Sequence, residues 1–283
     1  MDNTFPGTTK SGVNEKLENR MSTSSPTVTL STSATSIAEN AGSSLTLTAT
    51  SSIVADEDIT VSISTSGTGT EGTDYSTISD ITISAGATTG TASFTPSDDS
   101  VYEGNETGIV DISTVSGADA TEDGTQSVTI TINENESAPT VTLTSSASSI
   151  AENAGSSLTL TATLSVATTA NVTVGISTSG TGTEGTDYST ISDITISAGA
   201  TTGTASFTPT DDSIFEANET GIVDISGVSG ADAAEDGTQS VTITITNDDS
   251  APTVTLSTSA TSIAENAGSS LTLTATLSNP TTA

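Results

Sequence analysis

The chain has 283 residues and a formal net charge of −32, from 35 acidic and 3 basic residues, with neither histidine nor cysteine. This composition excludes disulfide bridges, zinc–thiolate sites and cysteine nucleophiles, and it removes histidine, the commonest general base and metal ligand. So acidic a surface does not suit nucleic acid, which needs a basic footprint, and no apolar run approaches the roughly 18 residues of a membrane span.

The first 26 residues differ from the rest of the chain. They hold all three basic residues, Lys10, Lys16 and Arg20, whereas residues 21–283 carry 32 carboxylates and no basic side chain. We expect residues 1–26 to form a polar N-terminal tail or linker. The acids of the remaining chain have no internal counter-charge, so this part is either disordered or neutralised by something from outside.

An internal repeat organises everything after the tail. The string SIAENAGSSLTLTAT occurs at 36–50, 149–163 and 262–276, with an offset of 113 residues each time. Residues 63–96 recur unchanged at 176–209. The predicted organisation is repeat 1 at 27–138, repeat 2 at 139–251 and an incomplete repeat 3 at 252–283.

Apolar residues alternate with Ser and Thr along short segments of each repeat. In repeat 1 this alternation predicts strands around 45–50, 59–63, 81–83, 92–94, 110–112 and 128–132, and repeat 2 follows the same pattern. About seven strands in roughly 110 residues, separated by Gly, Asp and Ser turns, are typical of immunoglobulin-like antiparallel β-sandwiches. A disordered Ser/Thr tract would not keep this alternation, so we predict an all-β fold of tandem sandwiches.

Some acids and aromatic residues are assigned simpler roles. We expect four aromatic residues to pack in small clusters: Tyr75, Tyr102, Tyr188 and Phe215. We expect three acids to be solvated: Asp80, Asp111 and Asp119. Paired acids such as Asp98 and Asp99 resemble a glycosidase dyad, but no aromatic-lined cleft for a sugar is expected. We therefore predict no catalytic residue and no enzyme activity.

Eight other carboxylates of repeat 1 lie where strands end. They follow the first, third, fifth and last strands, and these places share one pole of a sandwich whose strands alternate in direction. The residues are Glu39, Asp74, Asp98, Asp99, Glu103, Glu106, Glu134 and Glu136. Without Lys or Arg they repel one another or raise one another's pKa. Ca²⁺ takes six to eight oxygens from flexible loops and suits such a cluster better than Mg²⁺.

With these positions in view, the repeat resembles a Calx-β domain, the module of sodium–calcium exchanger regulatory regions and of many bacterial surface proteins. The matching strings are SIAENAG, GTDYSTISDITISAGATTGTASFTP, DDSVYEGNE or DDSIFEANE, and VTITITNDD. The resemblance covers almost everything after residue 26 and implies Ca²⁺ ligands at the C-terminal pole. In repeat 2 it implies Glu152, Asp187, Asp211, Asp212, Glu216, Glu219, Asp248 and Asp249.

Repeat 1 departs from the family pattern in its terminal acidic run. The family usually has several aspartates there, whereas repeat 1 has Asn133, Glu134, Asn135 and Glu136. We therefore expect repeat 1 to bind Ca²⁺ more weakly than repeat 2, or to bind fewer ions.

The leading functional prediction is a non-enzymatic, calcium-binding structural and adhesive repeat region of an extracellular or cell-surface protein, in which Ca²⁺ rigidifies the array. The expected partners are calcium ions and neighbouring repeats or subunits. Millimolar extracellular Ca²⁺ would fill weak sites. Two alternatives stay open: a filament subunit completed by strand donation, because residues 252–283 supply only two strands, and a Ca²⁺-sensing regulatory module.

Overall fold

The computed structural model describes residues 24–281, so nearly all of the predicted tail at 1–26 lies outside the described residues. The described residues form strands and turns, and they include no helix that could cross a membrane. They divide into two compact units. Unit 1 holds residues 24–98 and 105–133, and unit 2 holds residues 99–104 and 134–281. The predicted all-β fold is confirmed.

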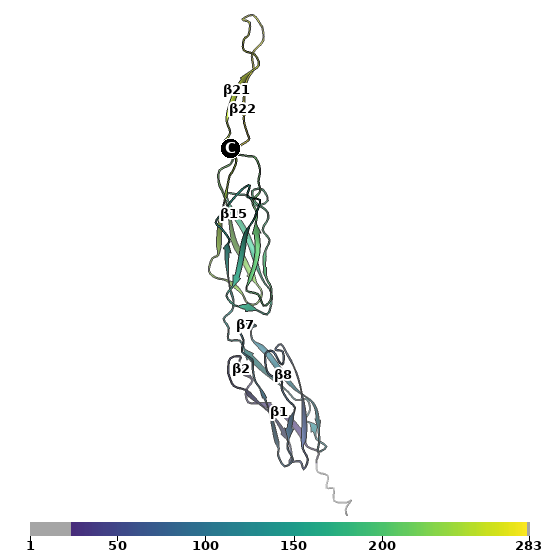
Figure 1. Ribbon diagram of the computed structural model, residues 1–283. Coiled ribbons are helices and arrows are strands. Elements are labelled where there is room, and N and C mark those ends of the chain that lie inside the picture. The colour runs from purple at the N-terminus through teal and green to yellow at the C-terminus, as the bar shows by residue number, and fades with distance from the viewer. Residues whose placement is uncertain (1–23, 282–283) are drawn as a thin grey trace, which may run out of the picture. The chain divides into compact units, whose positions relative to one another are not determined.

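Unit 1 is a sandwich of a four-stranded and a five-stranded sheet (Figure 1). Its strands are β1 (Thr27–Thr32), β2 (Ser36–Ala38), β3 (Leu45–Ser51), β4 (Ile59–Gly67), β5 (Ile81–Ile83), β6 (Thr89–Phe94), β8 (Glu106–Ser116), β9 (Thr121–Glu122) and β10 (Ser127–Asn133). The strand orders are β6-β3-β1-β9 and β2-β10-β8-β4-β5. The pairs β1–β9 and β2–β10 are parallel, and the other pairs of these sheets are antiparallel.

Unit 2 repeats this sandwich. Its strands are β11 (Thr140–Ser145), β12 (Ser149–Ala151), β13 (Leu158–Leu164), β15 (Val172–Gly180), β16 (Ile194–Ile196), β17 (Thr202–Phe207), β18 (Glu219–Ser229), β19 (Ala234–Glu235) and β20 (Ser240–Thr246). The strand orders are β17-β13-β11-β19 and β12-β20-β18-β15-β16. Unit 2 also contains the parallel pair β7 (Val101–Tyr102) with β14 (Ala167–Thr168), and the hairpin of β21 (Val254–Thr258) and β22 (Leu273–Leu277) (Figure 1).

The first strand of each sandwich crosses from one sheet to the other. In unit 1, β1 pairs with β3 in the four-stranded sheet, whereas β2 pairs with β10 in the five-stranded sheet. The backbone N–H of Glu39 then donates to the Asn133 carbonyl at 2.9 Å, and that of Glu152 in unit 2 donates to the Thr246 carbonyl at 3.0 Å. This crossing carries an acidic residue to the pole where the last strand ends.

A β-bulge interrupts the pairing of the two long central strands in each unit. In unit 1 the register of β4 on β8 shifts between Ser62 and Ile63. The carboxylate of Asp80 accepts hydrogen bonds from the Ser62 hydroxyl at 3.0 Å and from the Ile63 N–H at 3.1 Å. Asp80 is exposed, as predicted, but it also provides a partner for an N–H beside the bulge.

Each unit encloses its own apolar core, built mainly from inward-facing Ile, Val and Leu. One aromatic pair lies in each core: Tyr75 stacks on Phe94, and Tyr188 stacks on Phe207, with ring centroids 4.6 Å apart in both cases. The predicted packing of Tyr75 and Tyr188 is confirmed. Such a pair contributes about 0.5–1.5 kcal/mol beyond area burial.

Gly221 lies against the aromatic pair of unit 2. A Cβ at this position would lie 2.6 Å from Cε2 of Phe207, which is too close for two packed carbon atoms. Because the core is close-packed, we predict that Gly221→Ala lowers the free energy of unfolding by about 1–3 kcal/mol. Urea denaturation followed by circular dichroism measures this loss.

The matched control for this substitution is Gly227→Ala on the same strand. A Cβ at Gly227 meets nothing within 4 Å, and unit 1 carries Thr114 at the equivalent position. We expect no loss of stability or a small gain, because alanine reduces the entropy of the unfolded chain. Equal losses for both variants would contradict the proposed contact with the ring.

Candidate metal centre

Three strand ends of unit 2 meet at one pole of its five-stranded sheet. The parallel strands β12 and β20 both end there, and the antiparallel strand β18 begins there. Glu152 follows β12, Asn247 follows β20, and Glu219 opens β18 opposite Ile245. Strand register alone therefore brings two carboxylates and an amide to the same edge.

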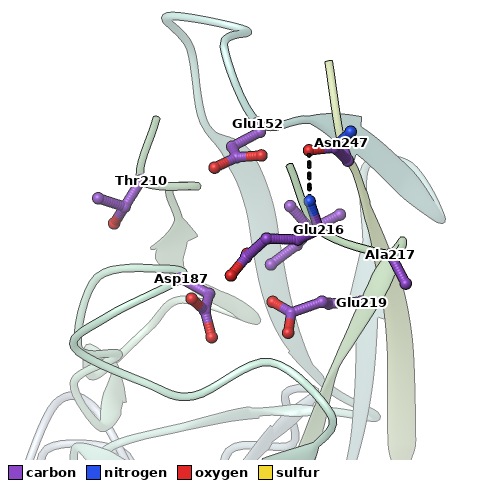
Figure 2. Close-up of a pocket in the computed structure, with 8 residues that line it drawn as sticks. Glu152, Asp187, Thr210, Glu216, Ala217, Glu219 and Asn247 are labelled. Carbon is purple, nitrogen blue, oxygen red and sulfur yellow. Dashed lines mark hydrogen bonds between the residues drawn. The ribbon is translucent and has the colours of Figure 1, made fainter. Parts of the chain in front are cut away.

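Asp187 and Glu216 reach this pole from two loops. Asp187 belongs to a tight turn in which its carboxylate Oδ2 accepts from the Thr183 N–H at 2.6 Å, and its own N–H donates to the Thr183 carbonyl at 2.9 Å. The next residue, Tyr188, is buried in the core and anchors this turn. The Glu216 N–H donates to Oδ1 of Asn247 at 3.3 Å (Figure 2).

The side chains of Asp187, Glu216 and Glu219 form a compact acidic group in unit 2. Each offers a carboxylate oxygen, and these oxygens lie within 4.8 Å of one another. Figure 2 shows them around a common space that Glu152 and Asn247 also line. The hollow has a volume of about 10 Å³, which corresponds to roughly one water-sized sphere. Its lining provides oxygen donors suited to a single hard cation.

Three glutamates at this pole have raised pKa values. Burial, followed by the negative charges of Asp187 and Glu216, raises the pKa of Glu219 to about 7. Burial and neighbouring carboxylates also raise the pKa of Glu152 and of Glu216. No Lys or Arg occurs among the described residues, so no basic side chain there offsets this repulsion. A divalent cation would relieve it.

The other predicted ligands of repeat 2 lie outside that three-carboxylate group. Asp211 is exposed. Asp212 donates its N–H to Oε1 of Glu152 at 3.3 Å, and its carboxylate accepts from the Ile214 N–H at 2.6 Å. Asp248 accepts a hydrogen bond from the Asn153 amide.

Asp249 differs from its neighbours. Its Oδ2 is buried and has no hydrogen-bond partner within the described part of the chain. Burial, followed by the charges of Asp248, Asp212 and Asp211, raises the pKa of Asp249. A buried carboxylate oxygen without a donor is costly unless a proton or a cation satisfies it.

The candidate ligands of repeat 1 are divided between the two units. Unit 1 contains Glu39, Asp74, Asp98 and Glu106, and unit 2 contains Asp99, Glu103, Glu134 and Glu136. Within unit 1, Glu39 follows β2 and is only 6% exposed, and Glu106 opens β8. The Asp74 carboxylate accepts from the Thr70 N–H at 2.6 Å, as Asp187 does from Thr183. These three acids thus occupy the same positions as Glu152, Glu219 and Asp187.

Glu134 is held by backbone amides. Its Oε2 accepts from the N–H groups of Glu103 at 2.6 Å and Gly104 at 2.9 Å, and its Oε1 accepts from Asn135 at 2.8 Å and Glu136 at 2.9 Å. Burial acts to raise the pKa of Glu134, but these hydrogen bonds outweigh it and hold the pKa below its usual range. The carboxylate therefore stays ionised and fixes the loop around it.

Asn247 stands where repeat 1 has Glu134, and it was not among the predicted ligands. Both residues accept a hydrogen bond from the backbone N–H of the glutamate that lies 31 positions earlier, Glu216 and Glu103 respectively. The 113-residue offset that aligns Asn247 with a predicted ligand was the signal that could have identified it.

Comparison with known families finds the Calx-beta domain twice, at residues 22–136 and 134–250. Three solved structures are similar in fold. CBD12 from CALX1.2 is 14% identical, with a TM-score of 0.35, over 77% of this chain and 99% of that one. The apo-form Calx CBD1 domain is 18% identical, with a TM-score of 0.34, over 39% and 99%.

The third similar structure is the Yersinia pseudotuberculosis adhesin InvE, which is 13% identical, with a TM-score of 0.35, over 77% of this chain and 58% of that one. At such identities and TM-scores, these likenesses assign no ligand or partner to the chain. No curated protein matches it.

In the absence of a bound cation, we predict that stability falls as the pH rises from about 5 to about 8. Folded Glu219 keeps its proton up to a pKa of about 7, whereas the unfolded chain releases it near the ordinary value of 4.5. The unfolded state therefore binds fewer protons in this window, and stability decreases with pH. Thermal melts in EDTA should show this slope, and Glu219→Gln should flatten it.

The control for the pH slope is Asp224→Asn. Asp224 lies on the same strand, β18, between the buried residues Val223 and Ile225, so its side chain points away from the core. The substitution removes one negative charge, as Glu219→Gln does, and should leave the slope in place. The same flattening in both variants would attribute the effect to overall surface charge and contradict the role of Glu219.

Proposed function

The chain belongs to the Calx-beta domain family, and from this premise we propose that it is a non-enzymatic calcium-binding repeat protein of the cell surface or extracellular space. The observation that carries the proposal is the acidic group of Asp187, Glu216 and Glu219, whose oxygens lie within 4.8 Å of one another. Glu152 and Asn247 line the same hollow. The fold thus holds like charges together in a part of the chain that has no basic side chain.

The chemistry of the ligands favours Ca²⁺ over other metal ions. Soft and borderline metals prefer Cys and His, and the chain has neither. Mg²⁺ requires near-ideal octahedral geometry and keeps several waters, whereas Ca²⁺ accepts six to eight oxygens in flexible arrangements, including bidentate carboxylates. The acids of this site come from two loops and two strand ends, and such an arrangement suits Ca²⁺ better than Mg²⁺.

Bound Ca²⁺ would stabilise the fold by joining these elements. Asp187 and Glu216 come from separate loops, while Glu152 and Glu219 lie at strand ends. The ion replaces their mutual repulsion with attraction to a shared positive charge. Because it binds the folded state, it raises the free energy of unfolding by about 2.7 kcal/mol when its concentration is 100 times the dissociation constant.

We predict that 5 mM CaCl₂ raises the unfolding temperature of the full chain well above its value in EDTA, and that 5 mM MgCl₂ raises it much less. Differential scanning calorimetry measures these shifts. The double variant Asp187→Asn/Glu216→Gln should lose the part of the calcium shift that comes from unit 2. Asp224→Asn is the control and should keep it. Identical melts of the unaltered chain in Ca²⁺, Mg²⁺ and EDTA would overturn the proposal.

The proposed role of the ion in an array rests on the connection between the repeats. β10 ends at Asn133 and β11 begins at Thr140, so the connecting segment is short, and it carries Glu134 and Glu136. We propose further that Ca²⁺ limits bending between successive repeats of a structural, adhesive array. Extracellular Ca²⁺, at millimolar concentration, would fill even weak sites of this kind.

Small-angle X-ray scattering tests this stiffening. We predict a narrower distribution of conformations in 5 mM CaCl₂ than in EDTA at equal ionic strength, because the ion would restrain the acidic connecting segment. An equally broad distribution in saturating Ca²⁺ would contradict the stiffening, even if the calcium shift in unfolding temperature were present.

The hairpin of β21 and β22 favours a second candidate function, that of a filament subunit. Val254, Leu256 and Leu273 are 67%, 71% and 68% exposed, whereas their equivalents in unit 1, Val28, Leu30 and Leu47, are 0%, 7% and 0% exposed. Strands from a neighbouring chain could cover this apolar face. Sedimentation velocity over a range of concentrations distinguishes the two: growing polymers support strand donation, and a concentration-independent monomer excludes it.

A further inference from the structure

Unit 2 contains a short parallel strand pair outside its sandwich. Val101 and Tyr102 of β7 pair with Ala167 and Thr168 of β14. The Tyr102 hydroxyl donates to Oδ2 of Asp232 at 3.0 Å. β7 belongs to the acidic loop with the sequence DDSVYEG at 98–104. This acidic loop thus contacts β14 through its aliphatic residue, Val101, and its aromatic residue, Tyr102.

The second acidic loop, DDSIFEA at 211–217, shows the same behaviour within unit 2. Phe215 occupies the position of Tyr102 and forms a parallel bridge with Thr281. Its N–H donates to the Pro280 carbonyl at 3.1 Å, and its carbonyl accepts from the Thr281 hydroxyl at 3.1 Å. The loop type therefore makes parallel backbone pairing in two separate places, as a two-residue strand at β7 and as an isolated bridge at Phe215.

Unit 1 has an equivalent of the accepting strand. The 113-residue offset maps Ala167 onto Val54 and Thr168 onto Ala55. Val54 is 60% exposed, whereas Ala167 is partly buried. Residues 54 and 55 form no strand, and no described segment pairs with them as β7 does with β14.

The backbone of this region has the arrangement seen in unit 2. The Ala55 carbonyl accepts from the Gly86 N–H at 2.9 Å, and the Thr168 carbonyl accepts from the Gly199 N–H at 2.8 Å. The hydrogen bond that holds the Thr168 carbonyl of β14 therefore has an equivalent at the Ala55 carbonyl of unit 1. What unit 1 lacks, within its described residues, is the added strand.

A hollow of about 250 Å³ lies beside Val54. Its lining includes Pro26, Ile53, Val54, Asp56, Ala118 and Asp119, which combine apolar side chains with two carboxylates. Asp119 is the equivalent of Asp232, the residue that accepts from the Tyr102 hydroxyl in unit 2.

Asp119 is presented by a strained turn that unit 2 shares. Ala118 and Asp119 have φ angles of 52° and 53°, and Ala231 and Asp232 have φ angles of 50° and 52°. A non-glycine residue in this region is strained and persists only where the surroundings enforce it. In unit 2 this turn places the Asp232 carboxylate where it accepts a hydrogen bond from the Tyr102 hydroxyl. In unit 1 the same turn gives Asp119 the backbone conformation needed for an equivalent hydrogen bond.

We propose that the hollow beside Val54 is a docking site for the acidic loop of another Calx-beta repeat, with a sequence of the type Asp-Asp-Ser-aliphatic-aromatic-Glu. The loop adds a short parallel strand along Val54 and Ala55, a mode of recognition known from other sheet edges. A tyrosine in the loop donates its hydroxyl to Asp119. None of the residues that line this hollow belongs to the metal centre, and the proposal does not depend on calcium.

The test uses the ¹⁵N-labelled full chain and a synthetic peptide with the sequence of residues 98–104, blocked at both ends. Chemical shifts are followed by NMR in 150 mM NaCl, once in EDTA and once in CaCl₂. We expect shifts at residues 53–56 and 118–119 in both buffers. The equivalent residues 166–169 are an internal control, because β7 already pairs with β14 and they should not respond.

Peptide variants test the aromatic contact. A peptide with Ser in place of Tyr should not produce the shifts. A peptide with Phe should bind about two- to tenfold more weakly, since it lacks one hydrogen bond. Asp119→Gly, which suits the positive φ angle, should make the Tyr and Phe peptides bind equally well.

Chain variants test the accepting strand. Val54→Asp should abolish binding because it adds a negative charge at the point of contact. Val54→Ala should retain binding, because alanine is the residue that accepts β7 at position 167. The absence of shifts at 53–56 at millimolar peptide, or shifts that survive Val54→Asp, would overturn the proposal. Neither result bears on calcium binding by the metal centre.

Discussion

Like charges held close together by strand register are the constraint on which this protein depends. In unit 2 the ends of β12, β18 and β20 meet at one pole, and two loops add Asp187 and Glu216 to the acids already there. No basic side chain in the described residues offsets them. Burial, followed by the repulsion from Asp187 and Glu216, raises the pKa of Glu219 to about 7. The sandwich therefore has to hold its loops together against repulsion, and a bound cation would remove that cost.

The two repeats differ at one position beside these acids, where repeat 1 has Glu134 and repeat 2 has Asn247. Glu134 receives four backbone N–H groups and has a lowered pKa, whereas its counterpart Asn247 is neutral. Burial, followed by the charges of neighbouring carboxylates, raises the pKa of Glu216 next to Asn247. Amide donors already compensate the charge of Glu134. We therefore expect the acids around Asn247 to depend more strongly on an external ion, in line with the expectation that repeat 1 binds Ca²⁺ more weakly.

Much of the fold follows from side-chain alternation, because a period of two identifies strands and their buried faces. Alternation does not reveal which strands are neighbours, so the passage of the first strand from one sheet to the other was not predicted. It also does not reveal local backbone needs, such as the N–H beside the bulge that Asp80 satisfies. Asn247 was overlooked because a neutral amide does not stand out among charged ligands. The pairing of β7 with β14 escaped prediction because two-residue strands have no periodicity.

The most direct test of calcium binding at this pole is a crystal structure of the chain grown with CaCl₂, in which anomalous scattering identifies calcium. We predict an ion in unit 2 bound by the carboxylates of Asp187, Glu216 and Glu219, at the 2.3–2.6 Å typical of calcium–oxygen bonds. A structure at saturating calcium in which these three carboxylates contact only water or protein would contradict the proposed metal centre.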